Sequence, residues 1–206
     1  MNNRKINDSS QLTASKDALK VIYYVIIGIA ITQSLDGVFI DSGVFVGVNL
    51  FDHVHLIPFF LLMAFLPTIC RFVHGASIHL DSIHTGTFKT LIDFVGFFLQ
   101  AIFFYLMALT IDNIVVFAVL FIMMLLMDAI WLITLCVIGY QNFKGTACQW
   151  VFSDAILVVV LLASSRLSDL NVISSLLTAI FILVASLSAT FFDYFQNKSF
   201  YFPGHE

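Results

Sequence analysis

Four charged residues stand within long apolar stretches of this sequence, and they are the first candidates for chemistry: Asp128, Arg71, Asp93 and Asp154. Charged side chains surrounded by hydrocarbon are costly, and they mark ion paths, proton relays or paired contacts between helices. The sequence alone leaves both a functional and a structural interpretation open for each of them.

Asp128 is the sharpest of these candidates. The five residues before it read Met-Met-Leu-Leu-Met and offer no polar partner along the chain. An isolated carboxyl group there must be protonated, reach water or find a partner on another helix. The functional interpretation is a proton- or cation-binding acid on a transport path. The structural alternative is a hydrogen bond to another helix, with Gln100 or Ser186 as the partner.

Arg71, Asp93 and Asp154 form a second candidate group, because all three are expected near the cytoplasmic ends of their helices. An unpaired charge at that depth is costly, so Arg71 is expected to contact Asp93 or Asp154. Such a pair can fix helix packing, or it can line a polar vestibule that admits an ion or an anionic ligand. Asp193, at the end of the last apolar stretch, could join this group, but the expectation is that it reaches water.

His79, Asp81 and His84 follow the pattern H-x-D-x-x-H and are weak candidates for metal ligands. On a helix, His79 and His84 would point about 140° apart, at about 100° per residue, so they could converge only in a loop. Stronger ligand patterns such as HExxH and CxxC do not occur in the sequence. We therefore expect a solvated polar loop over 74–89, with neither a metal nor another cofactor.

No enzyme signature accompanies these residues. The sequence contains no nucleophile elbow, no phosphate-binding Walker loop and no serine, histidine and aspartate spacing that implies a triad. Its three cysteines follow no ligand or disulfide spacing. The balance of these features is against an enzyme, although the sequence does not settle the question.

The composition of the whole chain is that of a membrane protein. Hydrophobic residues make up 60% of its 206 residues and charged residues 11%, whereas soluble proteins carry roughly a quarter charged residues. A membrane-spanning helix needs about 20 apolar residues. Six stretches are suited to this role: 18–35, 55–73, 90–111, 114–139, 148–165 and 172–193. The net charge of −4 and the lack of a long basic run argue against nucleic-acid binding.

The basic residues orient these six helices. If the N-terminus is cytoplasmic, eight of the nine lysine and arginine residues lie in or near cytoplasmic segments, and Arg166 is the exception. Cytoplasmic loops are enriched in these residues, so both termini are predicted to be cytoplasmic. Between the first two helices, β-branched and aromatic runs flank Asp41-Ser42-Gly43 and predict a small hairpin or loop on the outer face.

The sequence thus predicts an all-α integral membrane protein. Its parts are a polar cytoplasmic N-terminus at 1–17, a bundle of six transmembrane helices at 18–195 and a cytoplasmic tail at 196–206. We expect a multi-pass protein of a bacterial inner membrane. Its surroundings are the lipid bilayer, and a second copy or another membrane protein is its expected partner.

Two functions stay open at this point. One is a small channel or transporter that uses Asp128 and the group of Arg71, Asp93 and Asp154. The alternative is a non-catalytic membrane subunit or effector, which acts by binding partners or perturbing the membrane while the acids serve packing.

Overall fold

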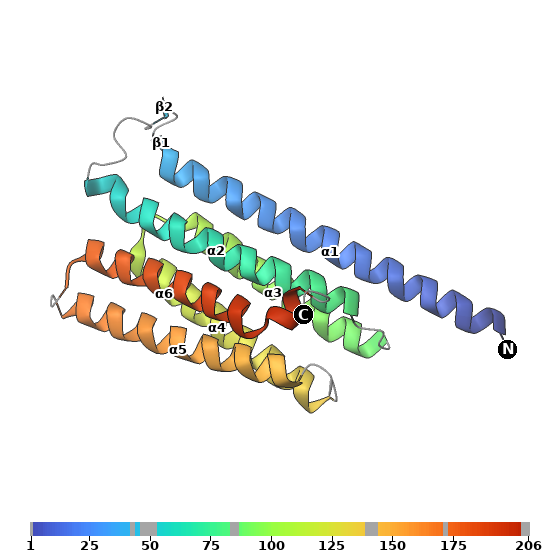
Figure 1. The fold of residues 1–206 in the computed structure, drawn as a ribbon. Coiled ribbons are helices and arrows are strands. Elements are labelled where there is room, and N and C mark those ends of the chain that lie inside the picture. The colour runs from blue at the N-terminus through green and yellow to red at the C-terminus, as the bar shows by residue number, and fades with distance from the viewer. Residues whose placement is uncertain are drawn as a thin grey trace.

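The computed structural model describes residues 2–41, 44–45, 53–82, 87–138, 144–170 and 173–202. These residues form seven helices and one pair of short strands (Figure 1). The helices are α1 (Asn2–Phe39), α2 (His53–Ser82), α3 (Thr87–Leu109), α4 (Ile114–Val137), α5 (Lys144–Asp169), α6 (Ser175–Gln196) and α7 (Lys198–Tyr201). The strands are β1 (Ile40–Asp41) and β2 (Val44–Phe45).

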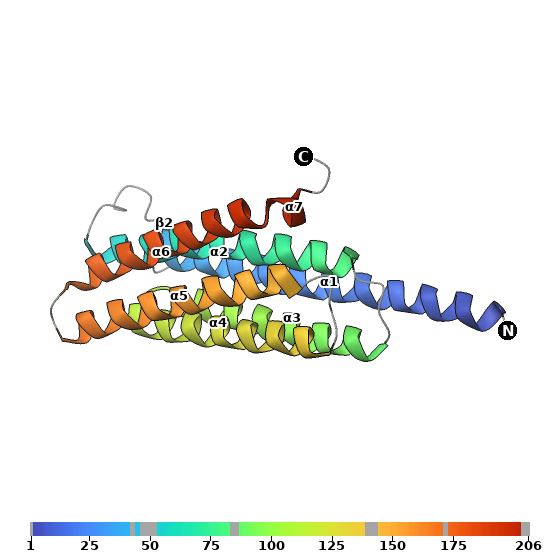
Figure 2. The same ribbon diagram turned by 60° about the horizontal axis from the view of Figure 1, so that its bottom comes forward.

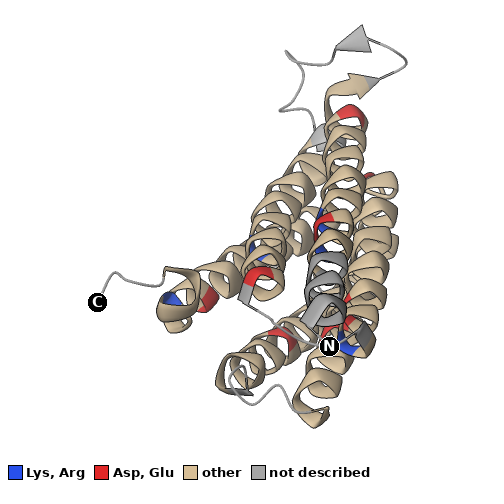
Figure 3. Cartoon of the chain, turned by 90° about the vertical axis from the view of Figure 1, so that its right-hand side faces the viewer, with Lys and Arg blue, Asp and Glu red and all other residues tan. Residues whose placement is uncertain are grey.

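Six of these helices, α1 to α6, are long and apolar enough to cross a membrane, and their apolar parts each contain at least 22 residues. This confirms the six predicted spans, including the short fifth one, which extends over Gly145–Ser168. Charged residues are sparse along the described helices (Figure 3), which suits a surface in contact with lipid. The chain is therefore a multi-pass membrane protein.

The spanning helices form two layers. Figure 2 shows α6, α2 and α1 in one layer and α5, α4 and α3 in the other. Contacts around the bundle follow the cyclic order α1–α3–α4–α5–α6–α2, which returns to α1. The middle helices of the two layers, α2 and α4, also touch across the interior. Side chains from α2 and α4 that point inward therefore meet at the centre of the bundle.

The helices begin and end at different residues from those that hydropathy predicts. The polar N-terminal segment continues the first span as helix, because α1 begins at Asn2. The prediction of a loop over 74–89 was wrong for residues 74–82, which belong to α2, and for residues 87–89, which begin α3. Hydropathy marks the part of a helix that lies in lipid, whereas backbone hydrogen bonding continues into polar residues that water can reach. Two helices begin at residues whose side chains cap the first turn. The Asn113 side chain accepts a hydrogen bond from Val116 N at the start of α4, and the Ser174 side chain accepts one from Leu177 N at the start of α6.

The strands β1 and β2 pair antiparallel where the sequence predicted a hairpin. Ile40 lies opposite Phe45, and Asp41 lies opposite Val44. The side of the membrane on which this pair lies stays a prediction, as does the cytoplasmic location of the two termini.

One half of the bundle interior is filled by phenylalanine rings. Phe65 on α2 contacts Phe104 on α3 and Phe117 on α4, with ring centroids 5.9 and 6.3 Å apart. All three rings are fully buried. They lie toward the strand-bearing end of the bundle, which is the predicted outer end. The buried charged residues gather in the other half, toward α7: Arg71, Asp93, Asp128, Asp154 and Asp193.

Candidate functional site

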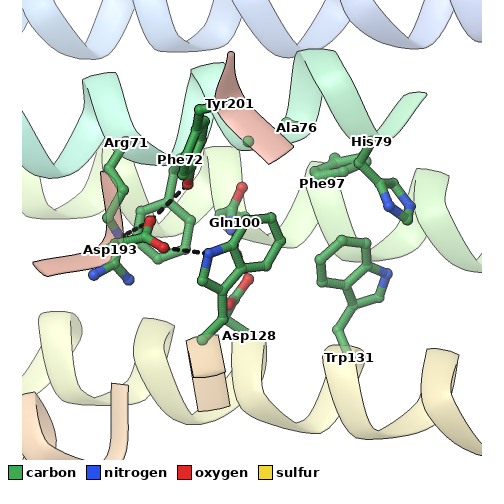
Figure 4. Close-up of a pocket in the computed structure, with 12 residues that line it drawn as sticks. Arg71, Phe72, Ala76, His79, Phe97, Gln100, Asp128, Trp131, Asp193 and Tyr201 are labelled. Carbon is green, nitrogen blue, oxygen red and sulfur yellow. Dashed lines mark hydrogen bonds and ion pairs between the residues drawn. The ribbon is translucent and has the colours of Figure 1, made fainter. Parts of the chain in front are cut away.

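A small polar cavity lies between the two helix layers (Figure 4). It has about 30 Å³ open to the centre of a water molecule, which is room for about two waters at roughly 10–15 Å³ each. The lining residues come from α2 to α7: Arg71, Phe72, Gly75, Ala76, His79, Phe97, Gln100, Asp128, Trp131, Trp150, Asp193 and Tyr201. Two of the four charged candidates, Arg71 and Asp128, thus line one cavity.

Arg71 has two acidic neighbours in this site. Its Nη2 donates to Asp154 Oδ1 at 2.5 Å, and its Nε lies 3.8 Å from Asp193 Oδ2. The side chains of Arg71 and Asp154 are 5% and 1% exposed, so the pair is sheltered from both water and lipid. The predicted contact between Arg71 and Asp154 is confirmed. Asp93 does not take part in it.

Asp128 is held by a chain of hydrogen bonds that joins three helices. Its Oδ1 accepts from Gln100 Nε2 at 2.9 Å, and Gln100 Oε1 accepts from the hydroxyl of Tyr23 at 2.7 Å. Of the two partners expected for Asp128, Gln100 is confirmed. The other, Ser186, instead bonds to Thr68 at 2.5 Å. Sequence reasoning missed Tyr23, because nothing in the sequence distinguishes it from the neighbouring tyrosine, Tyr24.

The carboxyl groups of Asp128 and Asp154 interact directly with each other. Asp154 Oδ1 accepts from Arg71, whereas Oδ2 of Asp154 accepts from no N–H or hydroxyl donor in the described part of the chain. Two adjacent carboxylates repel each other when both are charged, and they can share one proton instead. The facing carboxyl groups are the chemically most distinctive feature of the site.

Asp193 is buried in the site and accepts three hydrogen bonds, so the expectation that it reaches water was wrong. Its Oδ1 accepts from Trp150 Nε1 at 2.5 Å and from Asn197 Nδ2 at 2.7 Å, and its Oδ2 accepts from the Tyr201 hydroxyl at 2.6 Å. The residue is 2% exposed. Burial, followed by the negative charge of Asp193, raises the pKa of Tyr201 well above its usual value, because both favour the neutral phenol. The only sequence feature that bore on the location of Asp193 was its position near a helix end, and this feature favoured exposure to water.

Asp93 reaches the cavity through a histidine rather than through Arg71. Its Oδ1 lies 3.1 Å from His79 Nε2, and the His79 side chain is 1% exposed. The His79 ring packs edge-on against Trp131 at 5.3 Å and itself lines the cavity. His79 and Asp93 therefore form a second buried polar pair, on the side of the cavity nearer the end of α2 at Ser82 and the start of α3 at Thr87.

Two of the three residues of the weak metal-ligand pattern, His79 and Asp81, have separate partners. His79 contacts Asp93, whereas Asp81 pairs with Lys20 on α1. His84 lies outside the described residues. Within the residues that the structure describes, no group of three His, Cys, Asp or Glu side chains is arranged to hold a metal ion.

The site as a whole combines three carboxyl groups, those of Asp128, Asp154 and Asp193, with one guanidinium group and room for about two waters. This arrangement can bind, release and hand on protons, because carboxyl groups, imidazole and water are all proton carriers. No protein-family model, no curated protein and no solved structure matches the chain.

Proposed function

We propose that the protein is a proton-binding channel or transporter, in which Asp128 and Asp154 form the proton site. The observation that carries this proposal is the interaction between their two buried carboxyl groups, beside Arg71 and a cavity with room for water. A pair of carboxyl groups in contact titrates as one unit and takes up or loses a proton as the surroundings change.

The balance of charges supports proton binding. Three buried carboxyl groups face a single guanidinium group, and Arg remains charged in proteins. Fully ionised, the cluster would hold two uncompensated negative charges inside the membrane-spanning bundle, which is costly. A proton bound between Asp128 and Asp154 lowers that excess, so loading and unloading of this proton changes the charge at the centre of the bundle.

The oxygens of the cluster favour a proton over a hard metal cation. Asp128 accepts from the Gln100 amide, Asp154 from Arg71, and Asp193 from Trp150 and Asn197. Hard divalent cations need about six to eight oxygen ligands, and N–H groups here already bond to one oxygen of each of the three carboxyl groups. A proton requires only the two facing oxygens.

The surroundings of the cluster suggest a path on one side and a barrier on the other. His79 stands about 12 Å from Arg71 along α2, at about 1.5 Å per residue. It lines the same cavity and pairs with Asp93 on α3. In the opposite direction, Phe65, Phe104 and Phe117 fill the interior. Apolar constrictions of this kind block ions until they open. The arrangement supports a transporter-like cycle, in which water and protons would enter from the α7 end of the bundle.

Proton flux into liposomes tests this proposal. The purified protein is reconstituted with a pH-sensitive dye inside the vesicles, and a membrane potential is imposed. We expect flux with the wild-type protein and its loss in Asp128→Asn and Asp154→Asn, since the amide cannot ionise. Asp112→Asn, at an exposed acid in the turn between α3 and α4, should retain full flux. Wild-type flux no greater than that of empty liposomes, or full flux in Asp128→Asn, would reject the proposal.

A groove on the surface of the bundle favours the second function, a membrane subunit that binds a partner helix. It lies between α5 and α6, with about 440 Å³ open to a water-sized sphere, and Ala185, Ser188 and Ala189 form part of its lining. Small residues allow close helix approach in membranes. This function predicts that Ser188→Cys forms cross-links to a partner and that the Asp128→Asn protein keeps its activity.

A further inference from the structure

We propose that the short C-terminal helix α7 is a lid on the polar cavity, held closed by the hydrogen bond from Tyr201 to Asp193. The closure follows from the geometry of α7, and its role in transport rests on the proposed function. Residues 196–206 were predicted to be a cytoplasmic tail. Within this segment, residues 198–201 form a helical turn that packs against α2 and α6.

Tyr201 is the residue that holds α7 against the bundle. Its side chain is 3% exposed although it lies beyond the last spanning helix. The hydroxyl donates to Asp193 Oδ2 at 2.6 Å, and Figure 4 shows the side chain reaching toward Asp193 at the cavity. Ring contacts surround it: Tyr194 at 4.5 Å, His74 at 5.0 Å and Trp150 at 6.3 Å. Tyr201 is therefore wedged among α2, α5 and α6.

The turn itself has little stability apart from these anchors. Helices shorter than about 12 residues are marginal when isolated, and α7 contains four residues. Two further contacts hold it. Asn197 Nδ2 donates to Asp193 Oδ1 at 2.7 Å, and the Phe200 ring packs edge-on against Trp150 at 5.2 Å. Because both Tyr201 and Asn197 donate hydrogen bonds to Asp193, the position of α7 depends on one carboxylate group inside the site.

Release of Tyr201 would open one wall of the cavity. Tyr201, Asp193 and Arg71 all line it, and Arg71 lies between Asp193 and Asp154. With α7 displaced, water from the α7 end of the bundle would reach Arg71 and, beyond it, the facing carboxyl groups. The lid thus controls access to the proton site from the predicted cytoplasmic side.

Cysteine labelling tests the lid without any transport measurement. Ala76, which lines the cavity and is 4% exposed, is replaced by Cys in a protein whose three native cysteines have been replaced. A membrane-impermeant maleimide then reports water access from the α7 side. We expect slow labelling of Ala76→Cys alone and labelling on the order of tenfold faster with Tyr201→Phe, the change expected for loss of a hydrogen bond to a charged group.

The matched control is Tyr194→Phe. This tyrosine stacks on Tyr201, but its hydroxyl pairs with His74 Nδ1 at 3.1 Å rather than with Asp193, so labelling should stay slow. If Tyr201→Phe lowers the yield of folded protein, Asn197→Ala removes the other anchor of the same segment and should also speed labelling. Unchanged labelling in the folded variant overturns the lid. Fast labelling without proton flux would keep the lid and reject only the proposed function.

Discussion

Arg71 on α2 and Asp154 on α5 form a buried ion pair at 2.5 Å across the interior of the bundle. The two helices belong to different layers and are not neighbours in the cyclic order of packing. A long side chain with a charged head is needed to reach that far. The pair therefore ties the two layers together at the same point where it places a positive charge beside the facing carboxyl groups of Asp128 and Asp154.

Replacing Arg71 should lower the free energy of unfolding more than replacing Asp154. Arg71→Met leaves Asp154 and Asp193 without a cation, so we expect a loss of about 3–5 kcal/mol in the free energy of unfolding, typical of a broken buried pair. Asp154→Leu should cost less, because Arg71 keeps Asp193 as a partner. Unfolding in mixed micelles measures both. The exposed Arg166 is the control, and Arg166→Met should stay within about 0.5 kcal/mol of wild type. Equal, small losses in both variants would contradict the pairing.

Gly96 on α3 should not tolerate alanine. A Cβ at this position would lie 2.5 Å from Cδ1 of Trp131, and the Trp131 ring is buried against His79 and Phe97. We expect Gly96→Ala to destabilise the bundle by about 1–3 kcal/mol, as overpacking does.

The matched control for this substitution is Gly28 on α1, where a Cβ meets nothing within 4 Å. Gly28→Ala should be neutral or stabilise by up to about 1 kcal/mol, because alanine favours helix. Thermal unfolding of the two variants separates these outcomes. A neutral Gly96→Ala would show that Trp131 does not pack against α3 as described.

The orientation of the protein in the membrane can be measured directly. Phe45→Cys, in the strand β2 between α1 and α2, should react with an impermeant reagent added outside the cell. Tags fused to either terminus should report a cytoplasmic location, because the basic residues concentrate in the segments on that side. Labelling of residue 45 from the cytoplasm instead would reverse the predicted topology.

Tyr201 should remain protonated in the folded protein at a pH where free tyrosine ionises. Its raised pKa means that the stabilising hydrogen bond to Asp193 is fully present below about pH 10, the unfolded value. It is lost only as the pH rises through the higher value of the folded state. The difference in phenolate absorbance between wild type and Tyr201→Phe should therefore be absent at about pH 10–11 and appear on unfolding. A difference already present in the folded protein would contradict the buried hydrogen bond.

The sequence by itself determined the number and the approximate places of the spanning helices. The reason is physical: the thickness of the bilayer demands about 20 apolar residues for each span, and local hydropathy measures this directly. The same argument placed Asp128, Asp154 and Arg71 inside spans, since a charge stands out against an apolar background. The turn residues around Asp41 likewise indicated where β1 and β2 would pair.

Only the tertiary structure decided which of these side chains meet. Depth along a helix follows from residue number, but the direction in which a side chain points has meaning only once the neighbouring helices are known. The cyclic packing order α1–α3–α4–α5–α6–α2 brought Asp93 to His79 rather than to Arg71. The same packing buried Asp193 under α7 and set Asp128 against Asp154. Hydropathy cannot predict this packing order. A spanning helix needs an apolar surface toward the lipid whichever helices are its neighbours, so its hydropathy does not reveal them.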